Sequence, residues 1–253
     1  MGHYETLYQR SISDPEGFWA EQAQAIDWFQ FPDTILSQDE HGLYRWYEGG
    51  MLNTCHLALD YHVANGRGDQ TALIYDSPVT QTFQKFTYRE LLDETARFAG
   101  ALSQLGVGKG DRVIIYMPMV PQVVVGMLAC ARLGAIHSVV FGGFAPHELA
   151  LRIDDAQPKV ILTSSAGVEF DKIIPYQPIL ESALREASHQ VEHVVWHQRW
   201  IRKAEMTDAR YLDWELIART ATPVGCTPVA VTFAGGWKSQ HAAALQIFAN
   251  RHA

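Results

Sequence analysis

The sequence predicts an α/β protein in which a helical and irregular N-terminal arm precedes a parallel β-sheet. Three observations lead to this prediction. Hydrophobic residues make up 47% and charged residues 19% of the 253 residues, which is a globular composition. From about residue 71, short apolar runs of strand length alternate with amphipathic helical patterns. Glycine or proline marks most of the junctions between them. Such alternation is typical of βαβ units, which form parallel sheets.

Composition and charge exclude several classes of protein. Lys and Arg number 20 against 28 Asp and Glu, so the formal charge of -8 argues against a general nucleic-acid binder. No run of about 18 apolar residues predicts a membrane span, and the first residues carry no apolar signal-peptide core. Cys55, Cys130 and Cys226 are far apart and odd in number, which suits a reducing compartment. We therefore expect a cytoplasmic protein without membrane partners.

Residues 1–62 are rich in aromatic side chains but weakly periodic. Ser13 or Asp14 before Pro15 is typical of a helix start, so a helix is expected from Pro15 to about Trp28. An irregular aromatic segment follows, up to Gly50. We expect this arm to pack on a larger body, without closing a core of its own.

The following part shows a regular order of elements. Residues 71–75 and 82–86 predict a β-hairpin, and Thr87 with Glu90 predicts a capping box at the start of a helix that Gly106 ends. The strands expected after this helix are 112–116, 136–141, 159–163 and 193–196. The helices expected between them are 121–132, 146–155 and 178–187. Ligands of such sheets bind beyond the carboxyl ends of the strands, which directs attention to loops 117–120, 141–145 and 163–172.

The segment Phe141–Phe144 is the strongest candidate for a ligand loop on spacing alone. It follows a predicted strand and precedes a helix that begins at Pro146. Gly142 and Gly143 would allow the backbone to approach a ligand closely, and the next helix start offers free N–H groups to an anion. The alternative interpretation is an ordinary tight turn between a strand and a helix.

Two other small-residue segments favour structural interpretations. Gly106–Asp111 lies between a helix and the next strand, whereas a dinucleotide-binding loop must follow a strand, so we expect a helix stop and a turn. Thr163–Gly167 lies at a carboxyl end, where its hydroxyl groups could bind phosphate or cap a loop. Gly235–Ser239 lacks the spacing of a phosphate loop.

The histidines at 189, 193 and 197 could share one face of a helix, but the local pattern is that of a strand. On a strand, His193 and His197 would lie about 13 Å apart, so no metal site is predicted. No nucleophile elbow, catalytic triad order or carboxylate pair is found. We accordingly assign no catalytic residue and no metal ligand.

Two stretches carry a specific family resemblance, Tyr116–Pro121 (YMPMVP) and Met127–Phe144 (MLACARLGAIHSVVFGGF). They resemble the short-chain acyl-CoA synthetases, the acetyl- and propionyl-CoA synthetase branch of the AMP-forming adenylating enzymes. The similarity covers about residues 4–231. The other matching segments are Asp14–Trp19, Trp46–Asn53, Asp60–His62, Phe86–Leu91 and Gly110–Val113, and, towards the propionyl branch, Arg152–Ala156 and Lys172–Tyr176.

This resemblance implies a domain order and a reaction. Residues 1–62 would form the N-terminal extension, 63–231 the first part of the adenylate-forming, Rossmann-like domain, and 232–253 a divergent tail. In the family, a carboxylic acid such as acetate or propionate reacts with ATP to give an acyl-adenylate, from which the CoA thiol displaces AMP. The implied cofactors are CoA, ATP and Mg²⁺, and the implied partners are small molecules.

The resemblance also assigns candidate CoA-binding residues. Phe141, Gly142 and Gly143 would border the pantetheine tunnel. Lys172 lies where relatives present basic residues to the phosphorylated adenosine end of CoA. Glu169 and Asp171 beside it carry charges that oppose a phosphate.

The chain departs from the family after Ala230. The expected phosphate loop (Thr-Ser-Gly-Ser/Thr-Thr-Gly-x-Pro-Lys-Gly) is replaced by Val231–Ser239, and residues 216–253 contain no Asp or Glu. Such a tail is typical of a frameshift or a foreign origin, although a benign acid-poor tail is the alternative. We therefore predict a chain truncated before the ATP site and inactive alone. A partial sheet should also leave an exposed edge that invites self-association.

Two other functions are weighed against this one. The first is a non-catalytic module that binds CoA or another subunit, which a test of CoA binding would distinguish. The second is a Rossmann-type oxidoreductase, which is disfavoured because the first strand-to-helix turn lacks the glycine fingerprint.

Overall fold

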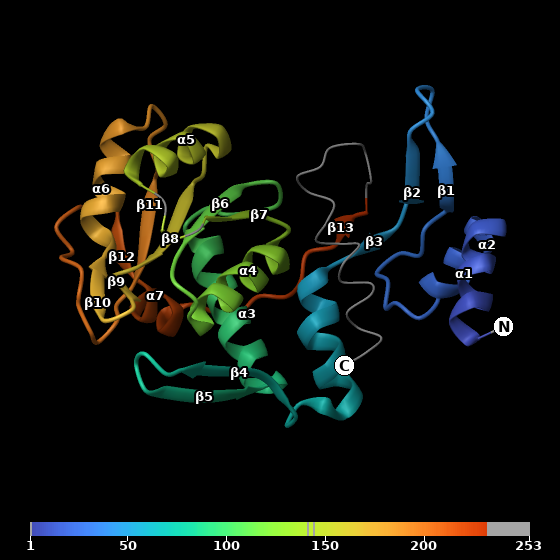
Figure 1. The fold of residues 1–253 in the computed structure, drawn as a ribbon, viewed down its shortest axis with the longest axis horizontal. Coiled ribbons are helices and arrows are strands. Elements are labelled where there is room, and N and C mark those ends of the chain that lie inside the picture. Colours follow the sequence, from blue (N-terminus) through green and yellow to red (C-terminus); the bar gives the residue numbers. More distant parts are fainter. Residues whose placement is uncertain (1, 141, 144, 232–253) are drawn as a thin grey trace. The chain divides into compact units, whose positions relative to one another are not determined.

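The computed structural model describes residues 2–140, 142–143 and 145–231, which form two compact units (Figure 1). One unit contains residues 2–61 together with 228–231, and the other contains residues 62–227. Predictions that concern Phe141 or Gly235–Ser239 lie outside the described residues.

The first unit begins with two helices, α1 (His3–Ser13) and α2 (Pro15–Ala23). Asp14 caps α2, because its side chain accepts a hydrogen bond from the backbone N–H of Gly17 at 3.1 Å. The predicted helix start at Pro15 is thus confirmed, whereas the predicted end at Trp28 is wrong, since α2 stops at Ala23. The sequence analysis missed α1, which has no buried residues and hence no apolar stripe to reveal it.

The remainder of the first unit is built from short strands around aromatic side chains. Strands β1 (Thr34–Gln38) and β2 (Tyr44–Glu48) pair antiparallel, and β3 (Met51–Leu52) pairs antiparallel with β13 (Val229–Ala230). The short helix η1 spans His56–Asp60. A hydrophobic cluster is formed by Ala23, Ile35, Tyr47, Leu52, Leu57 and Val231, with Trp19, Trp28 and Trp46 packed against it.

This cluster corrects the expectation that the arm has no core of its own. Val231 is far away in the sequence, and its backbone N–H donates to the carbonyl of Gly50 at 2.9 Å. The core is therefore completed by a returning segment, which local periodicity cannot reveal.

The second unit starts with the helix η2 (Val63–Arg67) and a hairpin of β4 (Thr71–Ser77) and β5 (Thr82–Thr87). Helix α3 (Tyr88–Gln104) follows, and the predicted capping box is present. The Glu90 carboxylate accepts from the Thr87 N–H at 2.8 Å, and the Thr87 hydroxyl accepts from the Glu90 N–H at 3.2 Å. The apolar stripe of α3, which includes Leu91, Phe98 and Leu102, is buried, and the chain leaves the helix at the predicted Gly106 with a φ of +78°.

A five-stranded parallel sheet forms the centre of the second unit, in the order β12-β11-β8-β6-β7. Its strands are β6 (Arg112–Tyr116), β7 (Ile136–Val140), β8 (Val160–Ser164), β11 (His193–His197) and β12 (Tyr211–Asp213). The connecting helices are α4 (Pro121–Leu133), α5 (Pro146–Ala156), α6 (Tyr176–Glu186) and α7 (Trp214–Thr220). The predicted α/β class and the alternating elements are confirmed, whereas β12 and α7 were missed.

Helices cover both faces of this sheet, as the alternation of its side chains requires (Figure 1). Ile114 and Tyr116 of β6 belong to a core cluster with α5 and α6. On the opposite face, a Cβ added at Gly126 of α4 would lie 3.0 Å from Leu162 and 3.6 Å from Ile115 and Trp214. The helix α4 therefore packs closely on that face, where a larger side chain has little room.

Two features at the ends of the strands matter for function. A second hairpin, β9 (Ala166–Glu169) and β10 (Lys172–Pro175), follows β8 directly and was not predicted. Strand β7 forms one edge of the sheet, and Ile136 and Val139 on it are 50% and 51% exposed. Among the described residues, no helix is long and apolar enough to cross a membrane.

The capping box should make a measurable contribution to stability. We expect Thr87→Ala to lower the free energy of unfolding by about 1 kcal/mol, because an N-terminal N–H of α3 loses its acceptor. The measurement is urea unfolding followed by circular dichroism. Ser103→Ala, on the exposed side of the same helix, is the control and should change the stability by under about 0.5 kcal/mol. Wild-type stability of Thr87→Ala would contradict a role for the cap.

Candidate functional site

The carboxyl ends of the five parallel strands bring several loops to one edge of the second unit. Strand β6 ends at Tyr116, β7 leads to the Gly142–Gly143 turn, β8 ends at Ser164 and β11 ends at His197. All five strands point the same way, so these loops are neighbours at one edge, where ligands of such sheets bind. The described parts of the predicted loops 117–120, 141–145 and 163–172 follow these strand ends.

The Gly142–Gly143 turn is held from the inside of the protein by two tyrosines. The Tyr116 hydroxyl donates a hydrogen bond to the carbonyl of Gly142 at 3.2 Å. A Cβ added at Gly142 would overlap the hydroxyl oxygen of Tyr176 and lie 3.1 Å from its Cζ. Gly142 is thus needed to accommodate a side chain of this protein, a reason that the sequence analysis did not foresee. Gly143 is exposed.

Lys172 lies at the start of β10, on the exposed β9–β10 hairpin. Its register partner across the hairpin is Glu169, and Asp171 precedes it. Within the described part of the chain, Lys172 forms no ion pair, and all three side chains are exposed. Lys172 and Pro175, at the two ends of β10, are about 10 Å apart at ordinary strand spacing. Pro175 precedes Tyr176, which contacts Gly142, so Lys172 lies at the end of β10 that is remote from this contact.

The serines after β8 support the structural interpretation of Thr163–Gly167. Ser164 and Ser165 are buried. The Ser165 hydroxyl donates to the carbonyl of Arg202 at 2.6 Å and accepts from the backbone N–H of Arg199 at 2.8 Å. Because this hydroxyl is used within the protein, it anchors the segment after β11 and does not present a phosphate site.

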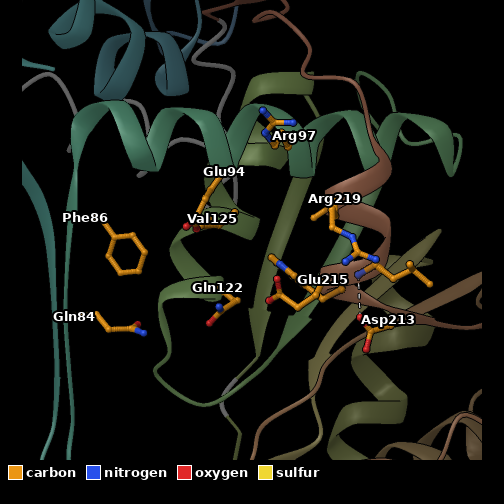
Figure 2. A pocket seen from close by; sticks show the side chains of 12 residues that line it. Gln84, Phe86, Glu94, Arg97, Gln122, Val125, Asp213, Glu215 and Arg219 are labelled. Atoms are coloured by element: carbon orange, nitrogen blue, oxygen red, sulfur yellow. Dashed lines mark hydrogen bonds between the residues drawn. The ribbon is translucent and has the colours of Figure 1, made fainter. Parts of the chain in front are cut away.

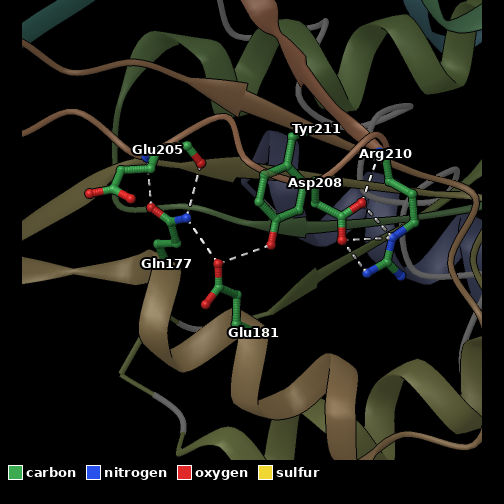
Figure 3. Close-up of polar contacts among 6 residues, drawn as sticks. All are labelled: Gln177, Glu181, Glu205, Asp208, Arg210 and Tyr211. Carbon is green, nitrogen blue, oxygen red and sulfur yellow. Dashed lines mark hydrogen bonds and ion pairs between the residues drawn. The ribbon is translucent and has the colours of Figure 1, made fainter.

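A polar network fixes the start of α6 to the connection between β11 and β12 (Figure 3). The Gln177 side chain donates to the carbonyl of Glu205 at 3.0 Å and accepts from its N–H at 2.8 Å. It also donates to the Glu181 carboxylate at 2.9 Å, which accepts from the Tyr211 hydroxyl at 3.3 Å. The position of the preceding residue, Tyr176, is therefore constrained by its neighbour.

An ion pair in the same connection has a marked electrostatic effect. The Arg210 guanidinium contacts the Asp208 carboxylate at 2.7 Å (Figure 3). Hydrogen bonds from the side chain and the backbone of Arg210 lower the pKa of Asp208 to about 2. Asp208 is therefore ionised at neutral pH and unsuited to proton transfer.

His197 ends β11 and is the most strongly perturbed histidine of this edge. Its side chain is only 16% exposed, and burial, followed by the charges of Arg199 and Lys203, lowers its pKa to about 4. Glu215 lies 3.8 Å from its Nδ1 atom, but that side chain is 70% exposed and solvent screens the attraction. His197 is therefore neutral at physiological pH.

The strand predicted for the histidine segment is confirmed. His193 and His197 lie at the two ends of β11. His189 precedes the strand, and its Nε2 atom is 3.0 Å from the carbonyl oxygen of Pro158. The three side chains are thus held at different positions along an extended chain.

The structure confirms a helix stop and turn at Gly106–Asp111. Gly106 and Gly110 have φ angles of +78° and +84°. The Asp111 carboxylate accepts from the Gly108 N–H at 2.8 Å and contacts Lys159 Nζ at 2.9 Å. These residues precede β6, at the edge opposite to the candidate site.

A cavity of about 590 Å³ lies elsewhere in the second unit, between β5, α3, α4 and α7 (Figure 2). The carboxylates of Glu94 and Glu215 face this space, and partial burial, followed by repulsion from Glu215, raises the pKa of Glu94. Arg97 also lines it but pairs with Asp93 at 2.8 Å. The lining contains none of the predicted site residues, and it carries the Arg219 guanidinium as well as carboxylates.

Sequence reasoning missed the two tyrosines that hold the turn. Tyr116 and Tyr176 were noted only within longer matching stretches. The ring centroids of these tyrosines are 5.0 Å apart, and both side chains are buried. The two adjacent glycines after a predicted strand were the only sign in the sequence that a large side chain packs against this turn. The sequence does not indicate which side chain does so, because the turn and Tyr176 belong to separate loops.

Comparison with known proteins shows which family this chain resembles over most of its length. The AMP-binding enzyme family matches residues 61–236, and the acetyl-coenzyme A synthetase N-terminus matches residues 4–58. An uncharacterized protein of Pseudomonas aeruginosa is 56% identical over 90% of this chain and 36% of its own length.

Named relatives and a solved structure extend this similarity. Acyl-CoA synthetase short-chain family member 3, mitochondrial, of Mus musculus is 45% identical over 90% of this chain and 34% of its own length. Propionate–CoA ligase of Salmonella typhimurium is 45% identical over 83% of this chain and 33% of its own length. The structure of acetoacetyl-CoA synthetase from Streptomyces lividans superposes with a TM-score of 0.81 at 25% identity, covering 91% of this chain and 35% of that one. The chain thus spans about a third of the length of the curated relatives it matches.

The buried neutral His197 should make stability depend on pH. Between about pH 6.5 and pH 4 the unfolded chain binds a proton at His197 that the folded chain does not bind. Stability is therefore lost as the pH falls through this window, by up to about 1.4 kcal/mol per pH unit. We expect His197→Gln to lose less stability than the wild type between pH 7 and pH 5, as measured by urea unfolding at both pH values.

His41→Gln is the matched control, since the His41 side chain is 77% exposed. This variant should keep the pH dependence of the wild type. Equal pH dependence of His197→Gln and the wild type would show that His197 does not cause the loss of stability at low pH.

Proposed function

The chain belongs to the AMP-binding enzyme family, and from this premise we propose that it provides the coenzyme-binding side of a short-chain acyl-CoA synthetase. The observation that carries the proposal is the Gly142–Gly143 turn at the carboxyl edge of the parallel sheet, where Gly143 is exposed. Sequence identity of about 45% to proteins named as short-chain acyl-CoA synthetases and propionate–CoA ligase supports the same reaction class.

The proposed reaction joins acetate or propionate to CoA in two steps. The carboxylate attacks the α-phosphate of ATP, which forms an acyl-adenylate and releases pyrophosphate. The CoA thiolate then attacks the acyl carbon, so that a C–S bond forms, the C–O bond to AMP breaks and AMP leaves. Mg²⁺ would stabilise the charge on the phosphates in the first step. Propionate is the substrate we favour, on the basis of the Lys172–Tyr176 segment and the relative named propionate–CoA ligase.

The residues at this edge have properties that suit part of CoA. Gly143 is exposed, so its backbone is accessible to a pantetheine chain, with Phe141 proposed at the same border. Lys172 is an exposed cation on the β9–β10 hairpin, where it could meet the phosphorylated adenosine end of an elongated ligand. Glu169 and Asp171 weaken this attraction, because both negative charges lie within three residues of Lys172. We therefore expect weak binding of the adenosine end.

We further propose that the 253-residue chain alone does not convert the carboxylic acid to an acyl-adenylate. The 253 residues contain no phosphate loop of the family's Thr-Ser-Gly…Lys-Gly type. The proposed compartment is the cytoplasm, which suits three cysteines that are odd in number and far apart in the sequence.

Two assays on the purified chain test this function. Isothermal titration calorimetry should detect CoA binding, and a pyrophosphate-release assay with ATP and propionate or acetate should detect no turnover. Release of pyrophosphate by the chain would overturn the proposed lack of activation. Absence of any CoA binding would overturn the proposed coenzyme-binding role.

Lys172 should contribute specifically to recognition of the 3′-phosphate of CoA. We expect Lys172→Gln to weaken CoA binding by up to about fivefold, since an exposed ion pair contributes at most about 1 kcal/mol. Binding of 3′-dephospho-CoA should be unchanged, as measured by calorimetry. Lys85→Gln, an exposed lysine on β5, is the control and should bind both ligands like the wild type. Equal losses for the two ligands would contradict a phosphate contact.

We also propose that β7, which among the described strands pairs with β6 alone, permits self-association of the chain through its other edge. Val139→Lys should weaken it, because a charged side chain on an edge strand opposes pairing with another chain. Sedimentation velocity over a concentration series measures this. Leu151→Lys, on the exposed surface of α5, is the control and should associate like the wild type. A wild-type chain that stays monomeric throughout the series would contradict the proposal.

A further inference from the structure

We propose that Tyr176 is a positioning residue that holds the Gly142–Gly143 turn in the geometry that receives CoA. The inference rests on the proposed function for its ligand, but the contact itself is a property of this chain. It adds Tyr176 to the candidate site as a residue that shapes the turn and takes no direct part in the reaction.

Tyr176 is itself held on three sides. Its side chain is only 5% exposed and belongs to the core cluster between the sheet, α5 and α6. Its backbone N–H donates to the carbonyl of Ser165 at 3.2 Å. The adjacent Gln177 is locked to Glu205 by the two hydrogen bonds shown in Figure 3. The ring therefore has a defined position before any ligand binds.

Two glycines from different loops make room for this ring. A Cβ at Gly167 of β9 would lie 2.9 Å from Cε1 and 3.0 Å from the hydroxyl oxygen of Tyr176. A Cβ at Gly142 would overlap the same hydroxyl oxygen. The Tyr176 ring thus fills the space between the base of the β9–β10 hairpin and the turn after β7. Movement at one glycine can be transmitted through Tyr176 to the other.

Tyr116 completes the contact with the turn from the sheet side. Its hydroxyl donates to the Gly142 carbonyl at 3.2 Å, while Tyr176 contacts Gly142 where a Cβ would stand. The two tyrosines thereby hold one residue of the turn and leave the next residue, Gly143, exposed. Preorganisation of this kind reduces the ordering cost that a ligand must offset.

The hydroxyl of Tyr176 remains available as a donor. It forms no hydrogen bond with the described residues, although the side chain is buried. Burial raises the pKa of Tyr176; the charge of Arg199 opposes this shift and that of Glu169 adds to it, so the hydroxyl keeps its proton at neutral pH.

The first experiment compares hydrogen–deuterium exchange of the segment around Gly142–Gly143 in the purified chain. Gly142→Ala should accelerate exchange by about tenfold, because overpacking of a Cβ against the Tyr176 hydroxyl displaces the turn. The double variant Gly142→Ala with Tyr176→Phe should return close to the wild type, since the overlapping oxygen is gone. Gly167→Ala should accelerate exchange at the turn although it lies on another loop. Gly108→Ala, where an added Cβ has its nearest neighbour at 3.9 Å, is the matched control and should change nothing.

The second experiment measures CoA binding to the same variants by calorimetry. Gly142→Ala and Gly167→Ala should each bind about tenfold more weakly, and Tyr176→Phe should rescue Gly142→Ala. Normal exchange at the turn in Gly167→Ala, or no rescue in the double variant, would overturn the role of Tyr176. Should the wild type bind no CoA, the proposed function fails, whereas the exchange measurements still decide whether Tyr176 positions the turn.

Discussion

Burial of a parallel sheet on both of its faces is the constraint on which the second unit depends. Parallel strands need crossover helices, and these helices cover the two faces that alternate side chains create. In β6, Ile114 and Tyr116 face α5 and α6, whereas Ile115 lies on the face covered by α4. Since all five strands run the same way, the loops after them collect at one edge. The topology of the sheet therefore determines where the candidate site lies, and individual side chains then determine its shape.

The turn at that edge is stabilised from within the protein. Glycine at position 142 is explained by the Tyr176 ring, and its carbonyl is held by the Tyr116 hydroxyl. The network around Gln177 in turn restrains Tyr176. A glycine in a ligand loop is often interpreted as space for the ligand. Here the space at one glycine is used by the protein, which leaves the exposed Gly143 as the accessible backbone.

The candidate site carries no strong positive charge that would distinguish it from the rest of the second unit. Lys172 stands beside Glu169 and Asp171, so the hairpin carries little net attraction for phosphate. The cavity near α7 is lined by charges of both signs, from Glu94, Asp213 and Glu215 and from Arg97 and Arg219. His197 is neutral because burial outweighs a carboxylate that solvent screens. The recognition of an anionic coenzyme would thus depend on shape and backbone contacts more than on charge.

Local sequence determined the class of fold and most of its second unit. The capping box at Thr87, the apolar stripe of α3 and the buried strands from Arg112 onwards follow from periodicity and turn chemistry, which act over a few residues. Motifs also located the Gly142–Gly143 turn and Lys172. Only the tertiary structure decided that Val231 completes a core with residues of the first unit, that β9 and β10 form a hairpin, and that Tyr176 contacts Gly142. The contacts of Val231 and of Tyr176 join segments distant in sequence, and no local pattern encodes which distant side chain will fill a given space. The β9–β10 hairpin is local, but its strands are only four residues each and leave a weak periodic pattern.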